Sequence, residues 1–201
     1  MTNLYRLAQL FCYLYFRVFH RFEVYGLNNI PSEGSFILAA NHESYFDPPA
    51  LGCKLPRNLH YFARDSLFIG PLGILIRNLN SIPVNRSRLD LITLKRVLNV
   101  LDKGNPLLVF PEGTRSVDGK LGDGKKGIGL LLAKSQVKVV PARVIGGGQI
   151  LGKGMLFPRI GKKLIIKYGK PLEIDEIDPG KSDLNRYETI SSKVLTAISR
   201  V

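Results

Sequence analysis

Short apolar runs alternate along this chain with segments of helical periodicity, and this alternation limits the folds open to it more than any other feature. The runs typical of buried strands are SFILAA (35–40), LHYFAR (59–64), PLLVF (106–110), VKVVPARV (137–144) and KLIIKYG (163–169). Helical spacing follows several of them, as in RLDLITLKRVLNVLDKG (88–104). Because strands that alternate with helices are typical of layered α/β proteins, we predict a mixed, largely parallel sheet flanked by helices.

The first twenty residues predict a separate amphipathic helix. On a helical projection its polar residues form one narrow stripe, and apolar residues cover the remaining arc. The stripe consists of Arg6, Gln9, Tyr13, Arg17 and His20. This pattern favours a helix that lies in a membrane interface with its cations at lipid phosphates, although an N-terminal helix docked on the core or on a partner subunit remains an alternative. We therefore predict a membrane-binding helix in residues 1–25 and an α/β domain in residues 26–201.

Other signals for targeting are weak in this segment. Arg6 and Arg17 interrupt its apolar centre, and no cleavage site of small residues follows, so we expect no secretory signal. No uninterrupted apolar run reaches about 18 residues, so we expect no simple membrane-spanning helix.

The net charge of +13, from 29 Lys and Arg against 16 Asp and Glu, favours an anionic partner. The excess is concentrated between residues 103 and 170, where fourteen residues are basic and three are acidic. Nucleic acid, anionic lipid, a phosphorylated metabolite and an acidic carrier protein all fit, as does a basic surface that binds nothing in particular. Cys12 and Cys53 have no metal or redox spacing, which is typical of a reducing compartment and predicts no metal site.

Two polar clusters follow apolar strands directly, NHESYFD after SFILAA and FPEGTRS after PLLVF. Ligands of open α/β sheets bind outside the carboxyl ends of the strands. If the two strands are close neighbours, we expect His42, Asp47, Glu112 and Arg115 to share one crevice.

The first cluster offers a general base. An imidazole titrates near neutral pH and can take a proton from an alcohol, and a carboxylate at its other nitrogen fixes its tautomer and orientation. His42 and Asp47 have suitable spacing if the chain turns into a helix, but the pair could equally cap that helix. Ser44 lies on no nucleophile-elbow motif and is not predicted to be a nucleophile.

The second cluster suggests an anion-binding loop. Gly113 allows close approach of backbone, Arg115 offers a planar fork for phosphate, and hydroxyls such as that of Thr114 add donors; the alternative is a polar turn. Arg86 in VNRSR, and Lys126 before a predicted helix, are each more typical of solvated charges when taken alone.

Together these motifs resemble the glycerolipid acyltransferase family. NHESYFD is similar to the first family motif, NHxSxxD, and FPEGTRS to the third. SIPVNR resembles the second, with Asn80 and Ser81 where a Gly commonly precedes it, and VVPARV resembles the fourth, centred on Pro141. The resemblance covers roughly residues 25 to 170.

The resemblance implies a role for each matching residue. His42 would be the general base and Asp47 its orienting partner. Further residues would bind the acceptor or shape its site, with Lys126 as an additional phosphate contact. The implied substrate site consists of Arg86, Glu112, Gly113, Thr114 and Arg115 together with that lysine.

The implied reaction moves a fatty acyl group from acyl-CoA or acyl carrier protein to the sn-2 hydroxyl of 1-acylglycerol-3-phosphate, giving phosphatidate. It implies no metal or redox cofactor, and a peripheral enzyme on the cytoplasmic face of a membrane. The alternatives are another acceptor (glycerol-3-phosphate, a lyso-ornithine lipid or another lysophospholipid) and a non-catalytic basic protein that binds membranes. Because no nucleic-acid motif is recognisable, we expect no nucleic-acid partner.

Overall fold

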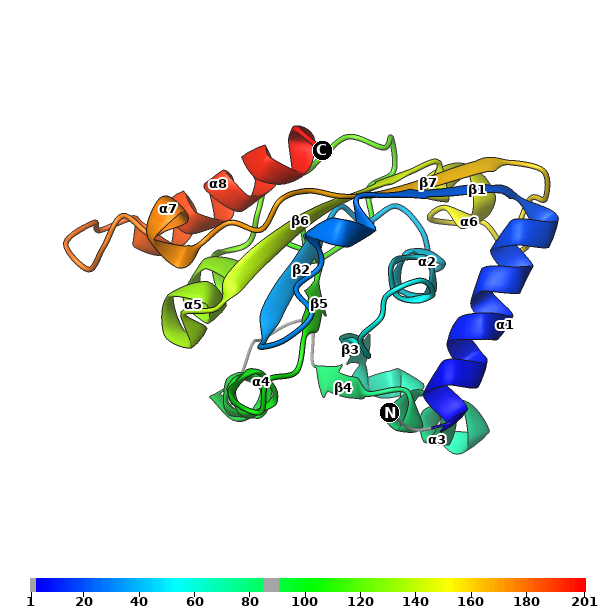
Figure 1. Cartoon of the computed structure of the whole chain (residues 1–201), viewed down its shortest axis with the longest axis horizontal. Helices are drawn as coiled ribbons and strands as arrows, with labels where there is room; N and C mark the ends of the chain where they lie inside the picture. The colour runs from blue at the N-terminus through cyan, green and yellow to red at the C-terminus, as the bar shows by residue number, and fades with distance from the viewer. Residues whose placement is uncertain (1–2, 85–90) are drawn as a thin grey trace.

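A twisted sheet of seven strands organises the part of the chain that the computed structural model describes, residues 3–84 and 91–201 (Figure 1). The strands lie in the order β1-β7-β6-β2-β5-β3-β4. Every neighbouring pair is parallel except β6 and β7, which are antiparallel. Their bounds are β1 Arg21–Tyr25, β2 Phe36–Ala40, β3 His60–Arg64, β4 Ser81–Val84, β5 Leu107–Val109, β6 Lys138–Ile145 and β7 Lys163–Tyr168. The predicted mixed, largely parallel α/β sheet is confirmed.

Helices cover both faces of this sheet (Figure 1). Helices α1, α2 and α6 pack on one face, and α4, α5, α7 and α8 on the other. Their bounds are α1 Asn3–Phe19, α2 Asp47–Gly52, α3 Gly70–Asn78, α4 Leu91–Asp102, α5 Lys126–Ser135, α6 Gly147–Leu151, α7 Ile174–Ile177 and α8 Arg186–Ser199, with short 3-10 turns at Leu27–Asn29 and Asp65–Leu67. Because β2, β3, β5 and β6 run parallel, their C-terminal ends lie on the same side of the sheet.

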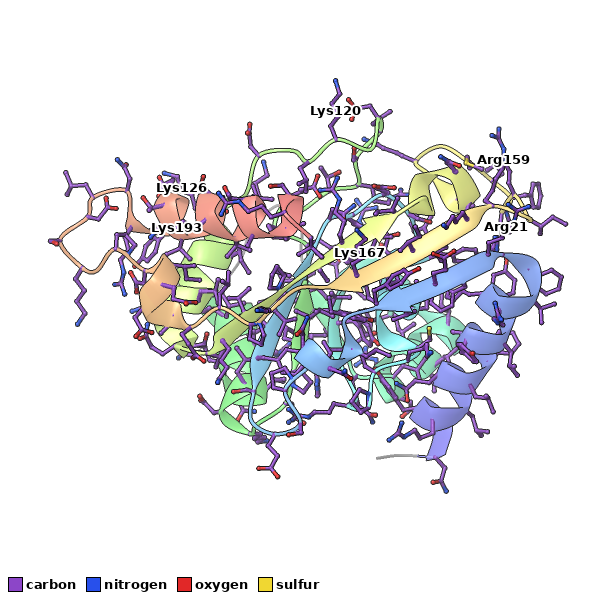
Figure 2. The ribbon with its side chains drawn as sticks, turned by 45° about the horizontal axis from the view of Figure 1, so that its top comes forward. Arg21, Lys120, Lys126, Arg159, Lys167 and Lys193 are labelled. Atoms are coloured by element: carbon purple, nitrogen blue, oxygen red, sulfur yellow. The ribbon has the colours of Figure 1, made fainter. Side chains whose placement is uncertain are left out.

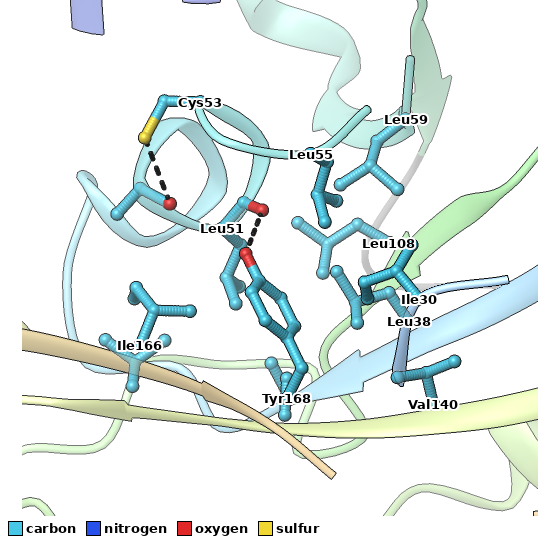
Figure 3. Packing of buried hydrophobic residues seen from close by; sticks show 14 of the residues in the cluster. Ile30, Leu38, Leu51, Cys53, Leu55, Leu59, Leu108, Val140, Ile166 and Tyr168 are labelled. Carbon is cyan, nitrogen blue, oxygen red and sulfur yellow. Dashed lines mark hydrogen bonds between the residues drawn. The ribbon is translucent and has the colours of Figure 1, made fainter. Parts of the chain in front are cut away.

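Strand β2 is buried on both faces because it lies near the centre of the sheet. Leu38 packs into the cluster on the side of α2, and Ile37 points into the cluster on the side of α4 and α8. This explains why the strand reads as a continuous apolar run with no polar alternation. On the α2 side the Tyr168 hydroxyl donates to the Leu51 carbonyl at 2.7 Å, which satisfies the one polar group of a buried ring (Figure 3).

The predicted N-terminal helix exists as α1, and much of its apolar arc is exposed, as a helix at a membrane interface requires. Part of the polar stripe faces the protein: Gln9 is buried and its amide donates to the carbonyls of Gly52 and Leu55 at 2.8 and 3.0 Å. His20 is buried as well. The two cations of the stripe, Arg6 and Arg17, are exposed. The expectation that they meet lipid phosphates stays a prediction.

The structure also revises the boundary drawn at residue 25. Residues 21–25 form β1, which pairs in parallel with β7 and belongs to the sheet. The division into a membrane-binding helix and an acyltransferase domain otherwise stays a prediction. Within the described residues, no helix is both long and apolar enough to cross a bilayer.

Candidate active site

The Asp47 carboxylate holds the turn between β2 and α2 around the His42 ring. Its Oδ2 atom lies 2.8 Å from His42 Nδ1 and accepts the backbone N–H groups of Glu43 and Ser44 at 2.6 and 2.7 Å. An ionised carboxylate only accepts hydrogen bonds, so Nδ1 carries the proton and Nε2 is the unprotonated ring nitrogen. Asp47 bonds to the turn before α2 and not to the helix N-terminus, and this distinguishes the observed pair from a helix cap.

The neighbouring β5 loop fixes the other sides of His42. Its ring stacks on Phe110, with the centroids 3.9 Å apart and the planes at 12°. Its backbone N–H donates to Glu112 Oε1 at 3.0 Å, and its carbonyl accepts the Ser116 N–H at 2.7 Å. Because β2 and β5 are adjacent and parallel, the two motifs after them meet, as expected. That the four predicted side chains share one crevice stays a prediction.

Glu112 is a buried organiser of these loops. Its second carboxylate oxygen, Oε2, accepts the Gly122 N–H at 2.9 Å, so one side chain joins the His42 backbone to the later part of its own loop. The loop enters through a turn in which the Gly113 N–H donates to the Phe110 carbonyl at 3.0 Å. Gly113 has φ 67°, a left-handed conformation that disfavours other residues.

Arg115, in the loop after β5, has unused hydrogen-bonding capacity. Its guanidinium lies over the Tyr45 ring at 3.6 Å from the centroid, a cation–π contact. Its Nη1 atom is buried and has no hydrogen-bond partner among the described residues. Thr114 next to it is exposed. A buried guanidinium nitrogen without a partner is suited to an anionic ligand.

Sequence reasoning missed three residues that shape the site, Asn41, Glu43 and Gly147. Asn41 bridges to β6, where its amide donates to the Val144 carbonyl at 2.8 Å and accepts the Val144 N–H at 2.7 Å. Glu43 accepts from Asn41 at 3.0 Å and from the Gly148 N–H at 3.2 Å, and burial raises the pKa of this carboxyl. The signal available in the sequence was the pair of polar residues Asn41 and Glu43 directly after the apolar strand β2.

Gly147 is required by the closeness of α6 to Asp47. A Cβ atom at this position would lie 2.5 Å from Asp47 Oδ1, a distance that carbon does not tolerate. Oδ1 is buried and has no hydrogen-bond partner among the described residues. The absence of a side chain on Gly147 thus leaves room for the carboxylate that orients His42.

Ser44 occupies the position between His42 and Asp47 without joining their chemistry. Its hydroxyl is buried, donates to the Leu151 carbonyl at 2.9 Å and accepts the Phe46 N–H at 3.1 Å. It ties the turn to α6, in line with the prediction that it is not a nucleophile.

The remaining predicted site residues lie elsewhere. Lys126 forms an ion pair with Glu188 on α8, and Figure 2 shows it beside that helix, so the structure does not bring it to His42. Its neighbour Lys125 instead approaches Gly113 and lines the pocket described next. Arg86 lies outside the described residues, and its role stays a prediction.

An apolar pocket of about 200 Å³ lies behind Phe110, the residue on which His42 stacks. It opens between β3, β5, α4 and α5. Its lining consists of Phe62, Leu94, Val97, Val109, Phe110, Pro111, Gly113, Lys125, Gly127, Ile128 and Leu131.

No metal cluster is evident in the described ranges, where no group of three or more His, Cys, Asp and Glu side chains could hold an ion. The predicted absence of cofactors stays a prediction.

Comparisons with known proteins agree on one family. The model of the acyltransferase family matches residues 21–145. A chloroplastic 1-acyl-sn-glycerol-3-phosphate acyltransferase of Arabidopsis thaliana is 33% identical over 152 residues, which are 74% of this chain and 42% of that protein. The 1-acyl-sn-glycerol-3-phosphate acyltransferase of Bacillus subtilis is 31% identical over 156 residues, 75% of this chain and 73% of that protein.

A solved structure matches nearly the whole fold. The crystal structure of the 1-acyl-sn-glycerophosphate acyltransferase of Thermotoga maritima superposes with a TM-score of 0.79 and 27% identity, covering 98% of this chain and 78% of that one. The chain spans less than half the length of the Arabidopsis relative. With half the chain and more matched by the family model, this protein belongs to the acyltransferase family.

Proposed function

We propose that this protein transfers a fatty acyl group from an acyl thioester to the sn-2 hydroxyl of 1-acylglycerol-3-phosphate, giving phosphatidate. The observation that carries the proposal is the His42–Asp47 pair, whose Nδ1 atom is held by the carboxylate so that Nε2 is the basic nitrogen. The relatives named 1-acyl-sn-glycerol-3-phosphate acyltransferase support this acceptor.

The chemical step needs one base and one activated carbonyl. The Nε2 atom of His42 takes the proton of the acceptor hydroxyl as its oxygen bonds to the thioester carbonyl carbon. The tetrahedral intermediate then collapses, the C–S bond breaks, and the imidazolium returns the proton to the thiolate, leaving an ester and a free thiol. Asp47 stabilises the imidazolium, and general base catalysis of this kind contributes about 10²–10⁴-fold. The thioester is already activated, so the reaction calls for no metal or redox cofactor.

The acceptor phosphate is proposed to bind Arg115. Its buried Nη1 atom has no hydrogen-bond partner among the described residues, and the Tyr45 ring holds the guanidinium plane in place. Lys125, which lies beside Gly113, adds a second cation on the same loop. Binding the phosphate here would place the sn-2 hydroxyl at His42, and positioning of reactants can supply a large part of a rate enhancement.

The apolar pocket behind Phe110 is proposed to hold an acyl chain. Its walls are almost entirely aliphatic and aromatic, and they include Phe110, the residue on which His42 stacks. A chain that enters here leaves its polar end near the base.

The lipid substrate is proposed to come from the cytoplasmic face of a membrane, on which the protein lies peripherally. The exposed apolar side of α1 supports this placement, because a helix with such a face sinks into the acyl boundary of a bilayer. The donor is acyl-CoA or acyl carrier protein; both are anionic, and the basic surface suits either.

Thiol release is the direct test of this function. Purified protein receives lysophosphatidate in vesicles, with acyl-CoA and acyl carrier protein offered separately, and glycerol-3-phosphate or another lysophospholipid in parallel reactions. We expect phosphatidate with one of the donors, and loss of the reaction in His42→Ala. His60→Ala is the matched control, because His60 begins β3 and so lies at the end of the strands away from the site. Thiol release that persists unchanged in His42→Ala would refute the mechanism. Faster reaction with glycerol-3-phosphate or another lysophospholipid would show that 1-acylglycerol-3-phosphate is not the preferred acceptor.

A further inference from the structure

The segment between α6 and β7 exposes three large apolar side chains within five residues. Within residues 153–162, called here the 153–162 loop, Leu156 is 87% exposed, Phe157 80% and Ile160 66%. Single exposed apolar residues are ordinary on protein surfaces, but a contiguous group marks an interaction site. Exposing all three side chains to water is unfavourable, so the loop is expected to bind an apolar partner.

The loop is also strongly cationic. It carries Lys153, Arg159 and Lys162, and no acidic residue occurs anywhere between Asp123 and Glu173. None of the three cations forms an ion pair within the described part of the chain. Apolar side chains at a tip with unpaired cations around them are complementary to a bilayer with anionic headgroups.

The loop continues the exposed apolar side of α1. The Gly161 N–H donates to the Phe19 carbonyl at 2.8 Å, and the Arg21 N–H donates to the Lys162 carbonyl at 3.0 Å, so the loop is bonded to the end of the helix. In Figure 1 the loop lies beside the C-terminal end of α1, and Figure 2 shows Arg159 near Arg21 on that side of the molecule.

The outward residues of α1 complete this surface. The side of α1 that faces away from α2 exposes its large apolar residues to solvent. They are Leu4, Leu7, Leu10, Phe11, Leu14, Val18 and Phe19.

The loop is joined to the catalytic turn as well. The Leu151 carbonyl, which accepts the Ser44 hydroxyl, lies at the end of α6 just before the loop, and the Arg159 N–H donates to the Ile150 carbonyl at 2.9 Å. A surface that binds the loop therefore also determines how far His42 lies from that surface.

We propose that the 153–162 loop inserts Leu156, Phe157 and Ile160 into an anionic bilayer and acts with α1 as a second membrane contact beside the active site. The proposal rests on the proposed function in one respect: the enzyme is taken to draw its lipid substrate from a bilayer. A membrane is favoured over an acidic protein because the apolar tip is continuous with the apolar face of α1, which offers no charge to a carrier protein.

A single tryptophan tests the insertion without any enzyme assay. The chain contains no Trp, so Phe157→Trp in the full chain reports only on the loop. Vesicles that contain anionic lipid should shift its emission to the blue, and lipids brominated on the acyl chains should quench it. Leu184→Trp is the control: Leu184 is 99% exposed, in the connection between α7 and α8 at the far end of the molecule. Its emission should not change.

Three outcomes would overturn the insertion. The first is emission of the Phe157→Trp protein that anionic vesicles leave unchanged, and the second is equal quenching of the Leu184→Trp protein. The third is a shift produced by acyl carrier protein and not by vesicles, which would assign the loop to a protein partner instead.

A second variant connects the loop to catalysis. Leu156→Asp combined with Phe157→Asp should weaken binding to anionic vesicles more than about tenfold, because two apolar side chains no longer leave water. Phosphatidate formation from vesicle-borne lysophosphatidate should fall accordingly, while the reaction with detergent-dispersed lysophosphatidate stays unchanged; Leu184→Asp should change neither. Equal losses in vesicles and detergent would contradict a membrane role. If no acyl transfer occurs at all, the proposed function fails while the tryptophan experiment still decides the insertion.

Discussion

Replacing Asp47 with Asn tests the proposed base most sharply, because the two side chains have nearly the same shape. In the protein, Oδ2 accepts from His42 Nδ1 and from the backbone N–H groups of Glu43 and Ser44 at 2.6–2.8 Å. An Asn side chain keeps these three bonds only if its carbonyl oxygen replaces Oδ2. Its amide nitrogen then replaces Oδ1, a buried position without a hydrogen-bond partner among the described residues and close to Gly147.

The magnitude follows from these contacts. A buried donor without an acceptor costs about 1–3 kcal/mol, and hydrogen bonds to a neutral oxygen are weaker than those to a carboxylate. We expect Asp47→Asn to lower the free energy of unfolding by about 2–4 kcal/mol. The effect on catalysis should be larger, because the imidazolium that forms in the reaction loses its carboxylate. The corresponding change in a Ser-His-Asp triad lowers kcat by about 10⁴-fold, and we expect about 10³–10⁴-fold here.

The assay measures kcat for thiol release at a temperature at which circular dichroism shows the variant folded. Asp178→Asn is the matched control, since Asp178 accepts from Arg186 Nε at 2.7 Å between α7 and α8. The Arg186 guanidinium holds the pKa of the Asp178 carboxyl at about 2. This control should lose stability and keep its kcat. A folded Asp47→Asn protein with kcat within about tenfold of the parent would refute the base assignment.

Three further changes probe other parts of the structure. Tyr45→Leu removes the ring beneath Arg115 and with it a cation–π contact of about 1 kcal/mol. Steady-state kinetics should then show the KM for lysophosphatidate raised about fivefold, with little change in kcat. An unchanged KM would contradict phosphate binding by Arg115. Gly147→Ala puts a methyl group 2.5 Å from Asp47 Oδ1, so kcat should fall about 10²-fold while circular dichroism stays native. Full activity would contradict the tight placement. His20 is buried with both ring nitrogens unpartnered among the described residues, and burial lowers its pKa. Because the unfolded chain then binds more protons than the folded protein, the free energy of unfolding falls as pH drops below about 6.5. Urea titrations should show that His20→Leu raises the free energy of unfolding by about 1 kcal/mol, with a larger gain at pH 5 than at pH 8. An equal gain at both pH values would refute this reading.

The strands that sequence reasoning located are those whose burial leaves a clear pattern. β2 and β5 are apolar on both faces, and the motifs after them are rich in side chains that turns and sites require. Strand β1 was missed because it is an edge strand with the sequence RFEVY, half exposed and without a continuous apolar run. Helix α6 was missed because it begins with glycines, which disfavour helices in isolation, and only its packing against Asp47 explains them.

The orientation of α1 shows a different limit. Helical periodicity tells that the two faces of a helix differ, but not which face meets the protein. The amide of Gln9 donates to the carbonyls of Gly52, the last residue of α2, and of Leu55 just after that helix. No local pattern contains this contact. The roles of His42 and Arg115 came from motif resemblance, whereas the buried carboxylate of Glu112 as a link between loops needed the coordinates.

The single antiparallel contact in the sheet, between β6 and β7, has a topological consequence. Because β7 runs opposite to β6, and β1 runs parallel to β7, the chain enters β1 and β7 at the edge where β2 and β6 end. The C-terminal end of α1, the connection from β6 to β7 and the turn that carries His42 therefore share one edge, although about 140 residues separate the first two along the chain. A wholly parallel sheet would have sent that connection across to the opposite edge. The length of the β6–β7 connection can consequently vary without any change in strand register.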